Sequence, residues 1–198
     1  MKIGVIGAGG IGQAFAGHAA KAGYEVILSN SRGPEGLIEA AREMGPNAKA
    51  GTREEAAAAD VVFLAVQWPQ VPDALGSLPA WRGRILIDAT NAVGPGFTTL
   101  DLNGKSSSEV VASHAPGARV VKAGNTLVRA MLAADPHVAG GRRVLFLCGD
   151  DGAAKQVVGE ILGRCGFATI DLGSLARGSP LQQFPGGVLP TLNLIKLG

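Results

Sequence analysis

Short apolar runs alternate with longer stretches of helical spacing along most of the chain. The runs are four to six residues long and rich in Val, Ile and Leu, which is the pattern of strands buried on both faces. Strands are expected at residues 2–6, 25–28, 47–50, 61–66, 84–88, 119–123, 143–147 and 168–171. Helices are expected at 10–22, 33–44, 53–59, 70–78, 106–114, 151–165 and after residue 126. The alternation predicts a single α/β domain with a doubly wound, mainly parallel sheet.

The end of the chain departs from this pattern. Residues 173–198 are rich in Gly, Pro and Leu and show no strong period. A long irregular segment is uncommon in a compact domain, so a short helix is expected near 189–197. We therefore predict a domain over 1–172 and a C-terminal extension over 173–198, which covers the pocket or contacts a second copy.

A glycine pattern follows the first expected strand directly. Gly7 permits a tight turn, Gly9 lets the backbone approach a pyrophosphate, and Gly12 lets the next helix pack closely on the strand. The helix N-terminus offers free N–H groups and a positive dipole end to a diphosphate. The pattern predicts a Rossmann-type dinucleotide site over residues 1–172.

The end of the second expected strand predicts which dinucleotide binds. NAD enzymes usually have Asp or Glu there, which accepts hydrogen bonds from the ribose 2′-hydroxyl. This chain has Ser29, Asn30, Ser31 and Arg32 instead. Hydroxyls, an amide and a guanidinium suit a 2′-phosphate, so NADP(H) is predicted over NAD(H).

Composition narrows the remaining choices. The chain has 18 Lys and Arg against 16 Asp and Glu, a net charge of +2, and no basic patch that would bind nucleic acid. Cys148 and Cys165 lie in apolar surroundings without metal-ligand spacing, so buried thiols and no metal site are expected. No apolar run approaches the length of a membrane span and the chain begins with its first strand, so a soluble cytoplasmic protein is expected.

No residue stands out as a catalytic acid or base. Lys122 and Asn125 have a spacing similar to an acid/base pair of 3-hydroxyacid dehydrogenases, but one residue too short. Lys122 is therefore predicted to be a strand-edge or surface charge, and His18 a helix-surface residue. Asp88 is expected to hydrogen-bond a loop. Hydride transfer needs mainly geometry, so catalysis by positioning is expected, without a catalytic side chain.

Several motifs occur in the order of a known family. They are Gly7–Gly12, Ser29–Pro34, Leu64–Trp68, Asp88–Asn91, Ser106–Glu109, Val121–Thr126 and Cys148–Asp151. Together they resemble the NADP-dependent oxidoreductases that use the deazaflavin coenzyme F420. The chain is also similar to the related NADPH-binding domain of membrane ferric reductases. The resemblance implies a homodimer that binds NADP(H), with coenzyme F420 as the small-molecule electron acceptor.

The resemblance also implies a set of contacts. The dinucleotide phosphates are expected at Gly9, Gly10 and Ile11, and the 2′-phosphate at Ser29, Asn30, Ser31 and Arg32. The nicotinamide is expected near Val66, Gln67, Trp68 and Asn91. The acceptor pocket is expected at Trp68, Gly124, Asn125 and Thr126.

Two positions of this pocket depart from the family, which leaves the acceptor open. The deazaflavin enzymes that this chain resembles have His at the position of Asn125. Many short relatives have a bulky residue at the position of Gly124. The alternatives are a non-catalytic NADPH sensor, a subunit of a redox assembly, or a flavin or ferric reductase. For Trp68, a wall of the acceptor pocket and a packing role both stay open.

Overall fold

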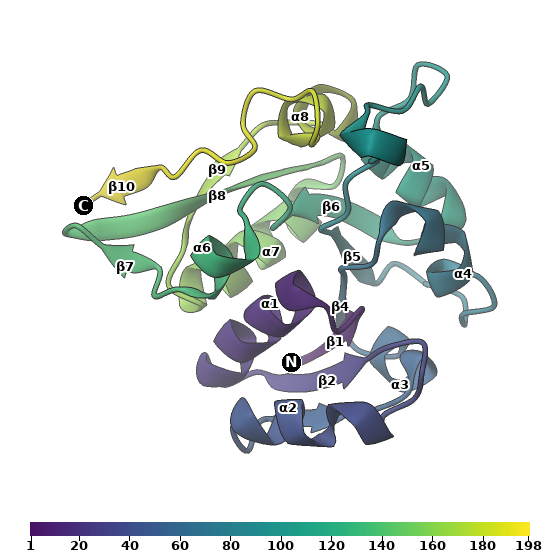
Figure 1. Cartoon of the computed structure of the whole chain (residues 1–198), viewed down its shortest axis with the longest axis vertical. Helices are drawn as coiled ribbons and strands as arrows, with labels where there is room; N and C mark the ends of the chain where they lie inside the picture. Colours follow the sequence, from purple (N-terminus) through teal and green to yellow (C-terminus); the bar gives the residue numbers. More distant parts are fainter.

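Six parallel strands form the centre of one sheet in the computed structural model, which describes residues 1–198 (Figure 1). Their bounds are Lys2–Ile6 (β1), Glu25–Ser29 (β2), Ala48–Ala50 (β3), Val61–Leu64 (β4), Ile85–Asp88 (β5) and Arg119–Ala123 (β6). Their order is β3-β2-β1-β4-β5-β6, which confirms the predicted doubly wound Rossmann-type sheet. The order reverses between β1 and β4, where such sheets have their ligand crevice.

The strands beyond β6 do not continue the parallel pattern. β8 (Gly141–Gly149) runs antiparallel to β6, and β9 (Ala168–Asp171) runs parallel to β8. The chain turns back through a hairpin formed by β7 (His137–Val138) and β8, with positive φ angles at Ala139 and Gly140. His137 is the first residue of the short strand β7.

The helices are shorter than their hydrophobic pattern predicts at two places. Their bounds are Gly10–Lys21 (α1), Ile38–Glu43 (α2), Arg53–Ala57 (α3), Val71–Leu75 (α4), Ser107–His114 (α5), Arg129–Ala133 (α6), Gly152–Arg164 (α7) and Leu175–Gln182 (α8). The helix expected at 33–44 is a 3₁₀ turn at Glu35–Leu37 followed by α2. The helix expected at 70–78 is shortened to α4, which follows a 3₁₀ turn at Trp68–Gln70. Capping boxes begin two of these helices: Ser106 and Glu109 at α5, and Thr52 and Glu55 at α3.

Two layers of helices cover the two faces of the sheet (Figure 1). The first face packs against α1, α2, α6 and α7, and the second against α3, α4, α5 and α8. Neighbouring residues of a strand face opposite layers: Phe63 belongs to the first core and Leu64 to the second. On the first face the ring of Phe63 stacks on Phe15 of α1, with centroids 3.9 Å apart.

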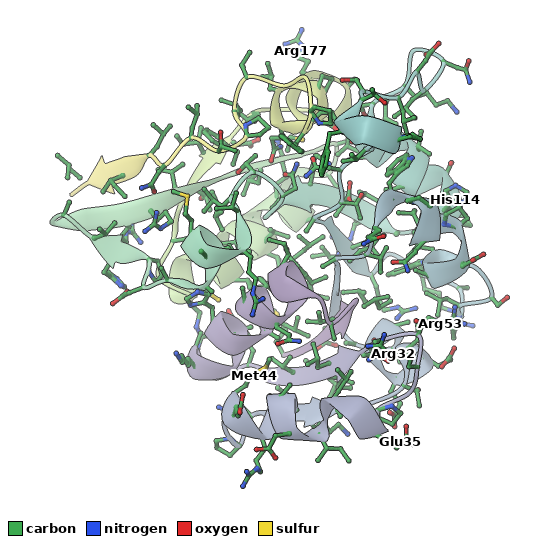
Figure 2. The ribbon with its side chains drawn as sticks, in the orientation of Figure 1. Arg32, Glu35, Met44, Arg53, His114 and Arg177 are labelled. Atoms are coloured by element: carbon green, nitrogen blue, oxygen red, sulfur yellow. The ribbon has the colours of Figure 1, made fainter.

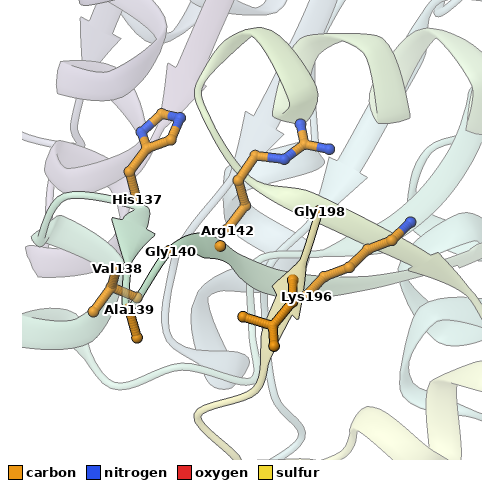
Figure 3. Close-up of a pocket in the computed structure, with 9 residues that line it drawn as sticks. His137, Val138, Ala139, Gly140, Arg142, Lys196 and Gly198 are labelled. Carbon is orange, nitrogen blue, oxygen red and sulfur yellow. The ribbon is translucent and has the colours of Figure 1, made fainter.

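The C-terminal extension differs from its prediction. Its helix is α8, and residues 189–197 hold no helix but a short strand, β10 (Ile195–Leu197), which pairs antiparallel with β8. The expected helix at 189–197 is therefore wrong, because the edge of β8 offers that segment backbone hydrogen bonds. Together β10 and the hairpin border an open hollow of about 460 Å³, with Arg142 and Lys196 at its sides (Figure 3).

His18 is half-buried and not a surface residue as predicted. Its Nε2 lies 2.8 Å from the carbonyl oxygen of Leu132 in α6, and its ring packs edge-on against Phe167. Burial lowers the pKa of His18 below its ordinary value. None of the helices combines the length and apolar character that crossing a membrane requires.

Candidate functional site

A cleft of about 920 Å³ opens at the carboxyl ends of β1, β2 and β4. Among the predicted site residues it is lined by Gly7, Gly9, Asn30, Ser31, Arg32, Val66 and Gln67. The cleft coincides with the crevice that the strand order creates, so sequence positions far apart in the chain meet where a ligand is expected.

The glycine loop has the backbone geometry that its spacing predicted. Gly7 has a φ of +104°, and a Cβ there would come within 2.4 Å of the carbonyl oxygen of Ala65. A Cβ at Gly12 would come within 1.9 Å of the carbonyl oxygen of Gly7. Gly9 has open space around its Cβ position. Gly7 and Gly12 are therefore required by packing, while Gly9 leaves the approach to the loop free.

Helix α1 begins without a side-chain cap. Gly9 occupies the N-cap position, and Gln13 N–H makes the bond to its carbonyl oxygen. The N–H groups of Gly10 and Ile11 precede that bond and have no partner within the helix. No acidic side chain lies in the first turn. The unpaired N–H groups and the helix dipole give this end of the cleft a positive potential that suits a phosphate.

The end of β2 presents only part of the predicted phosphate contact to the cleft. Ser29 is buried, and its hydroxyl donates to the carbonyl oxygen of Val5 at 2.8 Å. Asn30 Oδ1 accepts the N–H of Arg32 at 2.8 Å, which fixes the turn that follows the strand. Arg32 is exposed, lines the cleft and forms no salt bridge. Its guanidinium is thus free to bind an anion, whereas the Ser29 hydroxyl is already used.

A second arginine, which the sequence analysis missed, lines the same cleft. Arg53 is the first residue of α3, and Figure 2 labels it near Arg32. Its Nη1 donates to the carbonyl oxygen of Asp73 at 2.6 Å, and its Nη2 lies 2.9 Å from Glu54 Oε1. Its only sequence signal is its place at the start of the helix expected at 53–59, directly after the N-cap residue Thr52. Unlike Arg32, Arg53 already has a carboxylate partner.

Asn91 and Asn125 lie together and are not among the residues that line the cleft. Asn125 Nδ2 donates to Asn91 Oδ1 at 2.9 Å, and Asn91 Nδ2 donates to the carbonyl oxygen of Asn125 at 3.1 Å. The extension holds this pair. Asn125 Nδ2 also donates to the carbonyl oxygen of Gln182 at 2.7 Å, and the N–H of Phe184 donates to Asn91 Oδ1 at 3.0 Å. The strand ends predicted to surround the nicotinamide and the acceptor are therefore tied to the C-terminal segment.

The other predicted acceptor-pocket residues have packing roles in this structure. Thr126 accepts the N–H of Thr191 at its carbonyl oxygen, at 2.7 Å. Gly124 has a φ of +81°, and a Cβ there would lie 3.2 Å from the ring of Phe63. Trp68 is partly buried and packs against the core of the second face. This contact agrees with both roles left open for Trp68, a packing residue and a wall of the acceptor pocket.

Lys122 is completely buried, so its prediction as a surface charge is wrong. Strand β6 lies between β5 and β8 and is covered on both faces, which leaves no solvent for its side chains. Lys122 Nζ lies 3.3 Å from Asp88 Oδ2 and donates to the carbonyl oxygen of Thr90 at 2.9 Å. Asp88 also accepts the N–H of Thr90 at 2.8 Å and the hydroxyl of Ser108 at 2.6 Å. The prediction that Asp88 hydrogen-bonds a loop is confirmed.

Comparisons with known proteins agree with this geometry. The family described as NADP oxidoreductase, coenzyme F420-dependent, matches residues 2–92. A hypothetical protein from Sinorhizobium meliloti is 44% identical, with a TM-score of 0.93 over 99% of this chain and 96% of that one. A putative F420-dependent NADP reductase from Arthrobacter is 30% identical, with a TM-score of 0.77 over 90% of this chain and 88% of that one.

Two metalloreductases are also similar to this chain. The metalloreductase STEAP3 of Rattus norvegicus is 30% identical over 194 residues, which is 96% of this chain and 37% of that protein. The human metalloreductase STEAP2 is 27% identical over 187 residues. The chain thus spans a little over a third of the length of these relatives.

Proposed function

This chain belongs to the coenzyme F420-dependent NADP oxidoreductase family, and from that premise we propose that it transfers hydride between NADP(H) and a flavin-like acceptor, coenzyme F420 being the first choice. The observation that carries the proposal is the combination in one cleft of the uncapped N-terminus of α1 and the unpaired guanidinium of Arg32. The first suits a diphosphate and the second a 2′-phosphate.

The residues present fit NADP(H) better than NAD(H). In NAD enzymes a carboxylate follows β2 and accepts hydrogen bonds from the 2′-hydroxyl. Here that position is taken by Asn30, Ser31 and Arg32, and the acidic residues that line the cleft, Glu54 and Asp73, come from α3 and α4. A 2′-phosphate would meet a cation at the end of β2 without a neighbouring carboxylate on that strand.

The reaction requires positioning more than acid–base chemistry. NADPH supplies a hydride when bound, and the proton that balances reduction of the acceptor comes from solvent. The contribution of the chain is to hold the nucleotide, to orient the reacting rings and to exclude water. The Asn91–Asn125 pair, which hydrogen bonds to Gln182 and Phe184 hold in place, is our candidate for orienting the reacting rings.

A second candidate acceptor is a flavin, which takes a hydride, or a ferric chelate, of which two take the two electrons of one NADPH while a proton is released to solvent. The similarity to metalloreductases over nearly the whole of this chain favours it.

The second copy of the chain that is expected from the family would cover exposed apolar side chains of the C-terminal extension, where Val188 is 70% and Leu197 is 67% exposed. We therefore include a homodimer in the proposal, to be checked by light scattering during gel filtration, where a monomeric mass would refute it.

The test is an anaerobic assay of the purified protein with NADPH and oxidised coenzyme F420, which follows the loss of deazaflavin absorbance. NADH, FMN and a ferric chelate serve as parallel arms. We expect bleaching with NADPH and little with NADH. Reduction of FMN or of the ferric chelate, without loss of deazaflavin absorbance, would favour the second candidate. Tight NADPH binding without turnover in any arm would favour a sensor.

Arg32→Ala tests the cofactor assignment separately. Loss of a charge-assisted contact to phosphate is expected to raise the KM for NADPH about tenfold or more, with little change in kcat. Arg142→Ala is the matched control, because Arg142 is exposed and lies at the separate hollow of Figure 3. Unchanged NADPH kinetics in Arg32→Ala would contradict the NADP assignment.

A further inference from the structure

The first residue of α6 lies across the beginning of the glycine-loop helix. A Cβ placed on Gly10 would stand 2.3 Å from Cδ, 2.9 Å from Cγ and 3.0 Å from Nε of Arg129. These three atoms are the nearest neighbours of that position. The side chain of Arg129 therefore occupies the space that any side chain at residue 10 would need, next to an unpaired N–H group of the loop.

Arg129 has its cation available. The residue is exposed, and its guanidinium takes part in no salt bridge and no hydrogen bond. Helix α6 is nevertheless fixed against α1, because His18 Nε2 lies 2.8 Å from the carbonyl oxygen of Leu132. The backbone that carries Arg129 is thus held in place while its charged end is free.

We propose that Arg129 binds the diphosphate of NADP(H) from the α6 side, opposite the N–H groups of Gly10 and Ile11. This inference rests on the proposed function and adds a residue to its binding site. A guanidinium presents two parallel donors to phosphate oxygens, which backbone N–H groups of one helix cannot do from the other side. The small size of Gly10 is what lets the arginine reach this place.

The alternative source of the phosphate bound by Arg129 is a phosphate group on the acceptor. The two sources are separated by measuring binding of NADPH alone, without any acceptor present. A contact with the dinucleotide diphosphate weakens that binding when Arg129 is lost. A contact with the acceptor leaves it unchanged and raises only the KM of the acceptor.

The experiment compares two ligands across four variants. NADPH has the diphosphate, whereas adenosine 2′-monophosphate has only the phosphate expected at Arg32. We expect Arg129→Ala to weaken NADPH binding about tenfold and to leave binding of adenosine 2′-monophosphate within about twofold. Arg32→Ala should weaken both ligands, Arg129→Lys should lie between Arg129→Ala and the wild type for NADPH, and Arg142→Ala should change neither.

The glycine supplies an independent check. Gly10→Ala should displace Arg129 and weaken NADPH binding, and this loss should shrink in a chain that already carries Arg129→Ala. Such non-additivity is the signature of two residues that act on one contact. Wild-type dissociation constants for NADPH in Arg129→Ala, or additive losses in the double variant, would overturn the proposal. Absence of NADPH binding to the wild-type protein would instead refute the proposed function itself.

Discussion

Replacing Lys122 with Met tests how strongly the buried ion pair with Asp88 holds the carboxyl edge of the sheet. Both side chains are completely buried, and Nζ lies 3.3 Å from Asp88 Oδ2. Methionine fills a similar volume but removes the charge, and the Thr90 carbonyl oxygen then loses its donor at 2.9 Å. Breaking a buried pair by removing one partner costs about 3 to 5 kcal/mol. At about 2–4 °C per kcal/mol for a chain of this size, Tm should fall by about 10 °C.

The double variant separates the pair from its surroundings. Asp88→Asn leaves the Lys122 ammonium buried without its counter-charge, so it should be destabilising by a similar amount. Combining the two removes both charges at once, and the combined loss should be smaller than the sum by about 2 kcal/mol. Urea unfolding, followed by circular dichroism, gives the free energy of unfolding of each variant. The protein is measured without ligand, so the result does not depend on the proposed activity.

The matched control is Lys2→Met. Lys2 and Glu25 form an exposed pair at 3.9 Å, and such pairs contribute at most about 1 kcal/mol. The reasoning would be refuted if Lys122→Met cost no more than Lys2→Met. Additive losses in the Asp88 and Lys122 double variant would refute it equally.

Three further predictions concern the same fold. Gly12→Ala should lower Tm by about 10 °C or more and abolish NADPH binding, because its Cβ would stand 1.9 Å from a backbone carbonyl oxygen; Gly17→Ala in the same helix has open space and should not be destabilising. Burial lowers the pKa of His18 below 6.5, so the free energy of unfolding should fall as the pH drops below that value, and His18→Gln should flatten this decline; an unchanged urea midpoint profile between pH 7.5 and 5 would contradict it. Burial raises the pKa of Cys148 and Cys165 to about 12, so iodoacetamide at pH 8 should label neither thiol in the native protein and both in urea, as mass spectrometry would reveal.

The sequence predicted the central sheet well because its strands are buried on both faces. A short apolar run such as 61–66 fits a buried strand better than any other element. The spacing of the glycine loop fits one backbone geometry, the tight turn between a strand and a helix. The place of Arg32 in the cleft was predictable for the same reason, since the turn after β2 lies at the carboxyl edge of the sheet in this topology. These signals are local, and the topology connects them.

The failures have a common cause in non-local contacts. Lys122 was judged by its charge, yet its burial follows from β6 being a central strand and from Asp88, 34 residues away, lying beside it. The antiparallel direction of β8 depends on the β7–β8 hairpin, and no pattern in the residues of that hairpin predicts it. Arg129 was invisible because its place over Gly10 depends on how α6 packs against α1. Each of these features is decided by residues far apart in the chain, which a pattern along the sequence does not contain.

The two ends of the proposed site are held by different kinds of contact, and the difference bears on specificity. At the dinucleotide end, Gly7 and Gly12 are fixed by backbone atoms within 3 Å of any added Cβ, so substitution there disrupts the core. At the other end, Asn91 and Asn125 are held by hydrogen bonds to residues 182–184 of the extension. Substitutions in the extension can alter these hydrogen bonds without disturbing the strands of the sheet. The glycine loop is therefore built into the core of the fold, whereas the Asn91–Asn125 pair depends on the segment that packs over the edge of the sheet.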